Sequence, residues 1–262
     1  MYLHLTSAFF TGRKIMSLLT IDNLTHGFGE KTIYQSASLT LNKGERMGIV
    51  GHNGSGKSTL IKICTGELMP DHGQIQWLPK IRIGYLDQYA MADHNLTLEA
   101  FLQSAFEDLF EIEKRMLQLY ESFSDNPVHL KRAAQYQEQL ETGNFYQVQT
   151  EIEKTAQNLG LTAIGLNRRI AQLSGGQRAK VILAKLLLEK PDVLLLDEPT
   201  NFLDSNHVDW LASYLSNIEQ AFMIVSHDHG FLKTISNCIC DVENGQLKKY
   251  NGTYSDFIRQ KH

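Results

Sequence analysis

The sequence is poor in the residues that stabilise small secreted domains and in those that anchor a protein in a membrane. Its 262 residues include three cysteines, Cys64, Cys238 and Cys240, which form neither a CxxC pair nor a zinc-ligand spacing. An odd number of cysteines with apolar neighbours is typical of reduced core residues in a cytoplasmic protein and argues against a disulfide scaffold. No apolar run reaches the roughly 18 residues that a transmembrane helix needs.

Excess charge of either sign is also lacking. The 25 basic and 29 acidic residues give a net charge of −4, which provides no electrostatic indication of a nucleic-acid partner. Charged residues make up 21% of the chain, and with its ordinary apolar content this argues against global disorder. At about 150 residues per domain the length predicts one or two domains.

The first fifteen residues differ from the rest. They are mildly apolar, and Arg13 and Lys14 follow the apolar part, which is the reverse of the charge order in a signal peptide. We therefore expect residues 1–15 to be an N-terminal appendage and residues 16–262 to form the folded domain.

Most of the chain alternates between short apolar strands and amphipathic helices, the pattern of an α/β domain. The expected strands are 18–24, 37–41, 45–50, 74–77, 82–86, 193–196, 221–225, 239–242 and 246–250. The expected helices of this part are 57–64, 175–188, 206–215 and 253–260.

Residues 93–158 have a different pattern, with one proline, one glycine and helical spacing of the apolar residues. The spacing predicts a helical hairpin, with a first helix of about 26 residues and about 40 Å. Core helices of a compact domain are the alternative. The segment carries a net charge of −7, which leaves +3 for the remainder. The apolar seam comprises Leu98, Leu102, Ala105, Leu109, Ile112, Met116, Leu119 and Phe123.

A glycine-rich segment between an expected strand and an expected helix fits the pattern G-x-x-x-x-G-K-[ST]. Its glycines let successive backbone N–H groups face inward and bind phosphate oxygens. Lys57 would pair with the β- and γ-phosphates, and the Ser58 hydroxyl would bind Mg²⁺. The predicted nucleotide-binding residues here are Gly51, His52, Asn53, Gly54, Ser55, Gly56, Lys57, Ser58 and Thr59.

Two acidic residues end the apolar strand at 193–196. A parallel strand would deliver Asp197 to its carboxyl end beside the phosphate loop, where it can hold Mg²⁺. Glu198 can then orient and deprotonate an attacking water. Such a pattern is weak alone, but it becomes specific when a phosphate loop is present.

A second candidate anion site opens the helix at 175–188, where a serine and two glycines occupy the N-terminal turn. Its residues are Leu173, Ser174, Gly175, Gly176 and Gln177. Two such sites could serve two ligands, or one ligand held between two copies of the domain.

The order of these motifs resembles that of the nucleotide-binding domain of ATP-binding cassette (ABC) proteins, over roughly residues 18–250. Leu173–Gln177 matches the signature motif, Gln88 the Q-loop, Asp204 the end of the D-loop and His227 the switch histidine. The resemblance implies an α/β P-loop NTPase fold with a mixed, mainly parallel RecA-like core, an antiparallel β subdomain and a helical subdomain. It also implies ATP and Mg²⁺ as ligands and a head-to-tail pair of cassettes.

By this resemblance, Gln88 contacts the γ-phosphate and Mg²⁺, His227 stabilises the γ-phosphate, and Asp204 links the two sites across the interface. Adenine needs a flat platform, for which Phe28 is the candidate and Tyr34 the alternative. Either aromatic could instead belong to the core of the antiparallel subdomain.

The insert between Gln88 and Ser174 resembles the arm of the ABC-F subfamily, soluble two-cassette proteins that act on ribosomes and translation. The run 197–204, DEPTNFLD, resembles that subfamily's DEPTNHLD, and 249–257 resembles the end of a first cassette. Lys180 occupies a position after the signature motif at which arginine is common in this family. The alternative is the motor subunit of a membrane transporter. Because the arm is acidic, we expect it to contact basic ribosomal protein rather than RNA.

Overall fold

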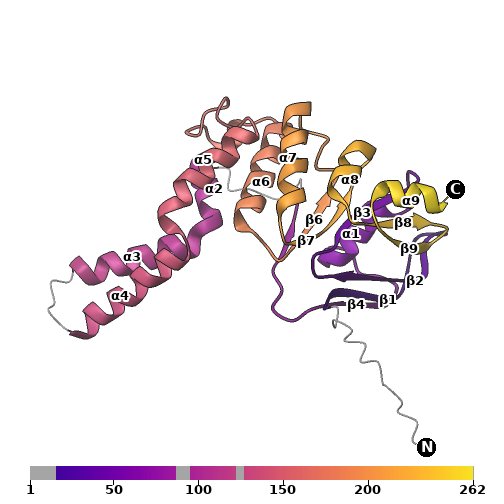
Figure 1. The fold of residues 1–262 in the computed structure, drawn as a ribbon, viewed down its shortest axis with the longest axis horizontal. Helices are drawn as coiled ribbons and strands as arrows, with labels where there is room; N and C mark the ends of the chain where they lie inside the picture. The colour runs from indigo at the N-terminus through magenta and orange to yellow at the C-terminus, as the bar shows by residue number, and fades with distance from the viewer. Residues whose placement is uncertain (1–15, 87–94, 122–126, 262) are drawn as a thin grey trace, which may run out of the picture.

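A computed structural model describes residues 16–86, 95–121 and 127–261. The expected appendage, Gln88 and the start of the insert lie outside the described residues. Figure 1 shows two sheets at one end of the molecule, helices packed beside them, and a pair of helices that projects away from them. No helix in the described part of the chain is both long and apolar enough to span a bilayer.

A three-stranded antiparallel sheet forms one layer. Its order is β2-β1-β4, with β1 at Ser17–Phe28, β2 at Lys31–Asn42 and β4 at His72–Trp77. β1 and β2 are joined by a tight turn, so that Phe28 lies opposite Lys31. These strands confirm the antiparallel β subdomain, and each is longer than the sequence pattern predicts.

The second sheet has six strands in the order β5-β6-β7-β3-β8-β9. Neighbouring strands are parallel from β5 to β8, and β9 pairs with β8 in the antiparallel direction. β7 stands between β3 and β6, so the carboxyl ends of all three lie at one edge of the sheet. The strands are β3 Arg46–Gly51, β5 Ile83–Tyr85, β6 Val193–Asp197, β7 Ala221–Val225, β8 Cys238–Glu243 and β9 Gln246–Asn251.

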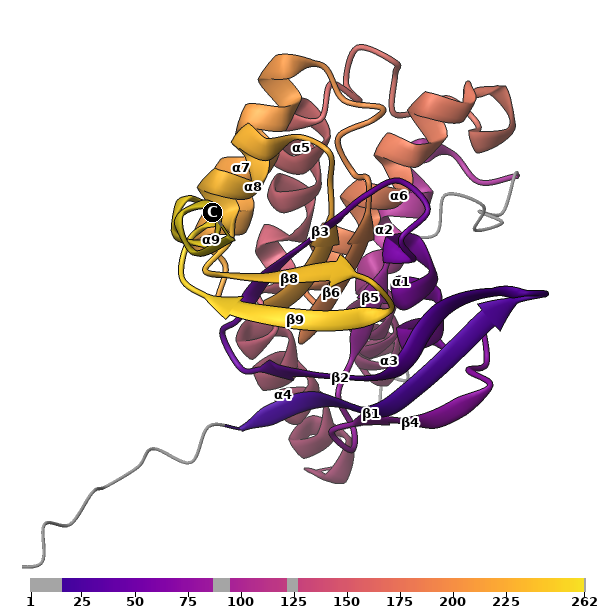
Figure 2. The ribbon, with the colours of Figure 1, turned by 90° about the vertical axis from the view of Figure 1, so that its right-hand side faces the viewer.

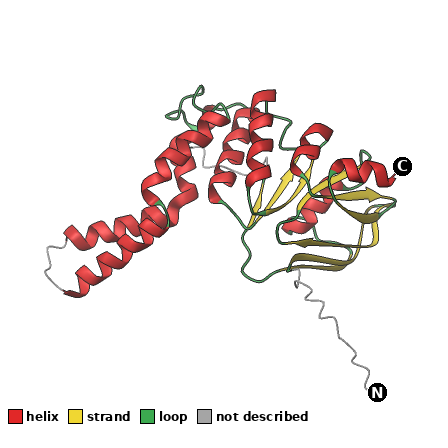
Figure 3. Cartoon of the chain, in the orientation of Figure 1, coloured by secondary structure: helices red, strands yellow, loops and turns green. Residues whose placement is uncertain are grey.

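Alternate residues of the central strands enter two separate cores, as the two-residue period of a strand requires. Val193 and Leu195 of β6 face α1 and the antiparallel sheet, whereas Leu194 and Leu196 face α6, α7 and α8. Figures 2 and 3 show the strands gathered between these layers. The helices are α1 Lys57–Thr65, α6 Gly175–Glu189, α7 Ser205–Asn217, α8 His229–Ile235 and α9 Tyr254–Lys261.

The sequence pattern did not predict α8. This helix has seven residues, and its second residue is Gly230, which weakens the helical propensity. It forms because Asp228 accepts a hydrogen bond from the Phe231 N–H at 2.9 Å and because Phe231, Leu232 and Ile235 are buried.

The insert forms the expected helical hairpin, but its seam is divided between two cores. α3 and α4 pair through a small core of Met116, Ala133 and Leu140. Leu98 and Leu102 of α2 instead pack into the main core together with α5. The elements are α2 Leu98–Gln103, a 3₁₀ turn at Ser104–Phe106, α3 Glu107–Glu121, α4 Pro127–Thr142, a 3₁₀ turn at Phe145–Gln147 and α5 Val148–Asn158.

The expectation of one uninterrupted 26-residue helix is therefore wrong, because the 3₁₀ turn interrupts it where the chain leaves the main core. Both interpretations of the insert describe part of it: α2 and α5 are core helices, and α3 with α4 forms a projecting hairpin (Figure 1). We call α3 and α4 the distal arm.

The distal arm has a small core, so one large-to-small substitution should open it locally. Leu140 is fully buried there, and Leu140→Ala should cost about 2–5 kcal/mol of local stability. Amide hydrogen exchange should accelerate across α3 and α4 and stay slow in β6 and β7. Leu130→Ala is the matched control, because Leu130 is 54% exposed on the same helix. Equal acceleration by both variants would contradict the assigned packing.

Candidate nucleotide-binding site

The phosphate loop connects the end of β3 to the start of α1, and neighbouring strands press closely against its glycines. Gly51 and Gly56 have φ angles of 150° and 114°. A Cβ at Gly51 would lie 2.5 Å from the Val242 carbonyl oxygen, and one at Gly56 would lie 2.5 Å from the Ile33 side chain. The loop can therefore curl in this way only with glycine at these two positions.

Tyr34 supports the phosphate loop from the antiparallel sheet. It is fully buried in β2, and its hydroxyl donates a hydrogen bond to the Gly56 carbonyl oxygen at 2.7 Å. Burial raises the pKa of the Tyr34 phenol, so the hydroxyl keeps its proton and remains a donor. A side chain in this position has no free ring face, which rules out Tyr34 as the adenine platform.

The concave side of the loop carries positive charge. Lys57 is buried, and its ammonium group donates to the carbonyl oxygens of Gly51 and His52, both at 3.0 Å. Lys31, from the β1–β2 turn, approaches the Gly54 carbonyl at 3.4 Å. Together with the positive end of α1, these cations make the loop an anion-binding site.

A cavity of about 430 Å³ brings the loop together with residues from distant parts of the sequence. Phe28 forms one wall; it is 53% exposed, and its ring meets the edge of the buried His26 ring at 4.9 Å between centroids. Its geometry suits an aromatic platform, whereas a buried core aromatic would be covered. The lining residues include Phe28, Lys31, Ile33, Asn53, Gly54, Gly56, Lys57, Ser58, Thr59, Glu198, Val225 and His227.

Sequence reasoning missed three of these lining residues, Ile33, Val225 and the charged Lys31. Only its position directly after the turn that follows Phe28 marks Lys31, and this signal becomes meaningful once β1 and β2 are known to pair.

The acidic end of β6 faces the same cavity. Glu198 has a φ angle of 48°, and its N–H donates to the Val225 carbonyl at 2.9 Å. Its carboxylate accepts the His227 N–H at 3.2 Å and lies 3.4 Å from His227 Nε2. Burial raises the pKa of the Glu198 carboxyl above its ordinary value, although contact with His227 opposes the shift. Left-handed backbone at a non-glycine residue is a feature concentrated at functional sites.

The signature segment lies elsewhere. Ser174 caps α6 by accepting the Gln177 N–H at 3.3 Å, and the Gln177 side chain accepts the Ser174 N–H at 3.0 Å. A Cβ at Gly175 would meet nothing within 4 Å, and one at Gly176 would meet only Phe202, at 3.9 Å. None of these residues lines the cavity at the phosphate loop.

Asp204 caps α7 and lies beside the signature helix. It accepts the His207 N–H at 3.3 Å, and its carboxylate is 3.8 Å from the Lys180 ammonium group. Gln88 lies outside the described residues.

The donors fit a magnesium site of the nucleotide-dependent kind. The described part of the chain contains no cluster of three side chains among His, Cys, Asp and Glu that could hold a metal ion by itself. Mg²⁺ in nucleotide sites is typically held by one or two carboxylates, phosphate oxygens and water, so a preformed cluster is not needed. Ser58 at the start of α1 and Asp197 at the end of β6 are donors of the appropriate type.

Comparison with known proteins agrees with this geometry. The family described as "ABC transporter" matches residues 34–201, which is more than half of the chain. Solved ABC cassettes share the fold: the ATP-binding subunit of an ABC transporter has a TM-score of 0.63 at 20% identity over 93% of both chains. The ATP-bound structure of a bacterial Atm1-family ABC exporter has a TM-score of 0.66 at 18% identity, over 94% of this chain and 40% of the other.

The chain therefore belongs to the ABC family and is an ATP-binding cassette of it. It is 44% identical over 93% of its length to an uncharacterized ABC transporter ATP-binding protein, YfmM, of Bacillus subtilis, and covers 48% of that protein. It is 34% identical over 88% of its length to the energy-dependent translational throttle protein EttA of Escherichia coli, covering 42% of it. ABC transporter F family member 2 of Arabidopsis thaliana is 28% identical over 94% of this chain, which covers 38% of it.

The hydrogen bond from Tyr34 should be needed for the shape of the loop. Tyr34→Phe removes one of the two hydrogen bonds that the Gly56 carbonyl accepts, the other coming from the Leu60 N–H at 2.8 Å, and should cost about 0.5–1.5 kcal/mol of stability in urea unfolding. ATP affinity should fall as well, because the loop loses its support. Tyr146→Phe is the control, since the Tyr146 hydroxyl is exposed and bonds to the Gln137 side chain, far from the phosphate loop. A Tyr34→Phe protein with unchanged stability and affinity would remove this role.

Proposed function

We propose that this cassette binds ATP with Mg²⁺, closes around it with a second cassette, and hydrolyses it to ADP and phosphate. The observation that carries this proposal is the single cavity in which Lys57, Ser58, Glu198 and His227 meet. The separate position of the signature supports a paired arrangement, in which each nucleotide contacts the phosphate loop of one cassette and the signature of the other.

In this proposal the chain's own residues bind the phosphates and the adenine ring. The backbone N–H groups of residues 51–58 and the Lys57 ammonium group bind the β- and γ-phosphates, and Phe28 stacks on adenine. Ser58, Asp197 and Gln88 are the residues assigned to hold Mg²⁺, which neutralises charge on the phosphate oxygens when bound. The residues Gly51–Thr59 and Leu173–Gln177 then form the two halves of a composite site.

Glu198 is assigned as the base that orients and deprotonates water. Its raised pKa makes it a stronger proton acceptor than an ordinary glutamate, while His227 holds the carboxylate from one side. His227 is also positioned to contact the γ-phosphate from the end of β7. Asp204, at the surface of the D-loop, is assigned to the interface between cassettes.

Glu198→Gln should retain ATP binding and lower kcat about a hundredfold or more, because the amide cannot accept the proton. In the unsubstituted protein, kcat should decline with decreasing pH as the carboxyl takes up a proton. Its raised pKa should place this decline above the range of an ordinary glutamate. Nucleotide-binding calorimetry and a pH profile of phosphate release measure both effects. Lys57→Ala is the contrasting variant, with ATP affinity lower by about tenfold to hundredfold. Normal turnover in Glu198→Gln would exclude it as the base.

We further propose that the cassette is one half of an ABC-F type protein that acts on translation in the cytoplasm. The translational relative EttA, the F-family relative and the arm-like insert support this role. The chain spans about half the length of these relatives or less, which leaves room for a second cassette. The domain assigned to this function is 16–262, with the arm insert at 93–158.

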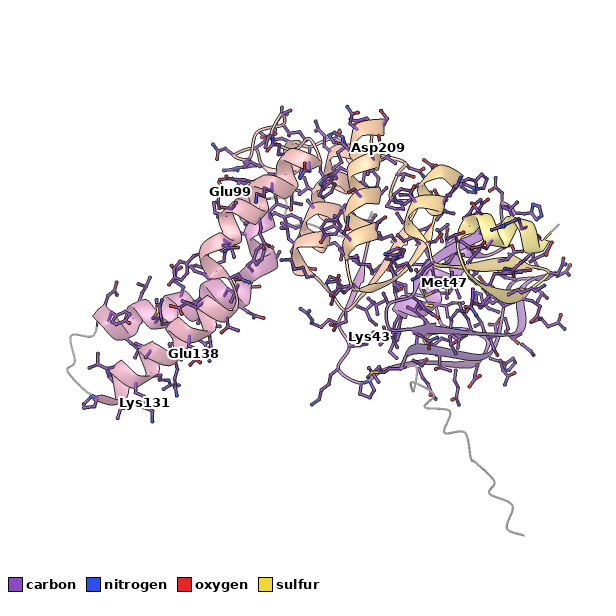
Figure 4. The ribbon with its side chains drawn as sticks, in the orientation of Figure 1. Lys43, Met47, Glu99, Lys131, Glu138 and Asp209 are labelled. Carbon is purple, nitrogen blue, oxygen red and sulfur yellow. The ribbon has the colours of Figure 1, made fainter. Side chains whose placement is uncertain are left out.

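The distal arm is the part assigned to contact the ribosome. Figure 4 shows Lys131 and Glu138 on α4, far from Met47 and the sheets. In the two helices of the distal arm acidic residues outnumber basic ones seven to four, and such a surface favours a basic protein over RNA phosphates. The role of a transporter motor remains the alternative, supported by the description of YfmM as an ABC transporter ATP-binding protein.

Deleting the distal arm should test this role without destroying the cassette. Residues 98–106 and 145–158 must stay, because Leu98, Phe101 and Ile152 belong to the main core. Residues 107–142 can be replaced by a short glycine–serine linker, since Phe106 and Gly143 line one cavity of about 280 Å³. We expect the complete protein to lose ribosome co-sedimentation while ATP binding is kept.

Reversing charge on the distal arm, with Glu138→Lys and Glu141→Lys, gives a version of this test that leaves the helices in place. It should weaken ribosome association more than Lys131→Gln does. Unchanged co-sedimentation of the deletion variant would exclude the arm as the contact, whereas a lack of co-sedimentation by the unsubstituted protein would favour the transporter role.

A further inference from the structure

His207 lies where three parts of the molecule meet. It is in the first turn of α7, directly after the D-loop, and its ring is about four-fifths buried. Its Nδ1 atom is 2.8 Å from the Asp204 carboxylate and 3.2 Å from the Lys180 ammonium group of α6. Lys180 lies in α6, the helix whose N-cap, Ser174, belongs to the signature.

The third contact comes from the turn after α5, the core helix into which the distal arm returns. Gly160 follows the end of α5 with a φ angle of 70°, and a Cβ placed there would lie 2.7 Å from His207 Cε1 and 2.8 Å from Nε2. The Cε1–Nε2 edge of the imidazole ring therefore packs closely against this glycine. Any larger residue at position 160 would push the ring away, because Asp204 and Lys180 restrain its other side.

His207 Nδ1 has two polar neighbours, the Asp204 carboxylate and the Lys180 ammonium group, and it can form a hydrogen bond with only one of them in a given protonation state. A single ring nitrogen cannot donate to Asp204 and accept from Lys180 at the same time. The shorter distance, 2.8 Å to a carboxylate, assigns the proton to Nδ1. Lys180 then forms an ion pair with Asp204 at 3.8 Å. The same carboxylate is therefore bound by His207 of α7 and by Lys180 of α6.

We propose that His207 is a positioning residue that couples α5, the core helix into which the distal arm returns, to the composite ATP site. Movement of α5 is transmitted by Gly160 to the imidazole ring, and by the ring to Asp204 of the D-loop and Lys180 of the signature helix. This inference rests on the proposed function, because its consequence for turnover requires a cassette that hydrolyses ATP with a partner. Its structural part, the ring bonded to Asp204 and seated on Gly160, does not depend on turnover.

The test is a double-mutant cycle in the complete protein. His207→Ala should lower kcat about threefold to tenfold with KM for ATP nearly unchanged, because the phosphate loop is untouched. His207→Asn should restore most of kcat, since its amide N–H can donate to Asp204. Gly160→Ala should lower kcat to a similar extent, and it should have no further effect in the His207→Ala protein, where no ring remains to be displaced.

Gly165→Ala is the matched control for backbone strain. Gly165 lies in the same loop at a φ angle of 95°, and a Cβ there would meet nothing within 4 Å. This variant should lose stability as Gly160→Ala does but keep its kcat. If Gly160→Ala were equally harmful with and without the His207 ring, strain alone would explain it and the coupling would be refuted.

Nitrogen chemical shifts of the His207 ring separate this inference from the proposed function. We expect a protonated Nδ1 in the unsubstituted protein and a displaced signal in Gly160→Ala. A ring with unprotonated Nδ1 would overturn the inference even if the protein hydrolysed ATP. Expected shifts in a protein without ATPase activity would contradict the proposed hydrolysis and the coupling to turnover, while the contact itself would stand.

Discussion

The position of β7 between β3 and β6 is the constraint on which the rest of the structure depends. Because these strands are parallel, the phosphate loop, the acidic end of β6 and His227 emerge at one edge of one sheet. The bond from the Glu198 N–H to Val225 turns the chain sharply at that edge and aims the carboxylate toward Lys57.

Both faces of this sheet are covered, and the two covers carry different functions. The face toward α1 and the antiparallel sheet supports the phosphate loop, through Tyr34 below it and Phe28 beside it. The opposite face supports the signature helix, and the base of the arm packs into the same core. The base of the arm is thus continuous with the layer that carries the signature helix, whereas the phosphate loop belongs to the other layer.

Features that depend on residues close together in the sequence could be predicted from it, and features that depend on contacts between distant segments could not. The phosphate loop, the strand ending in Asp197 and Glu198, and the capped signature helix are each specified within about ten residues, and all lie where the pattern places them. Contacts between distant segments were missed or misassigned. Tyr34 supports Gly56 from another strand, Lys31 reaches the loop across a turn, and the seam of the insert is shared between two cores.

By itself the sequence determined the α/β class, the order of the motifs and the presence of a helical insert, because backbone propensity and residue period act over short distances. Only the tertiary structure decided which aromatic lies open beside the phosphate loop and which is buried under it. It also decided where the insert leaves the core and that His207 meets Gly160 just after α5. These choices depend on packing between segments far apart in the chain, where burial and excluded volume act on pairs of residues that no local pattern links.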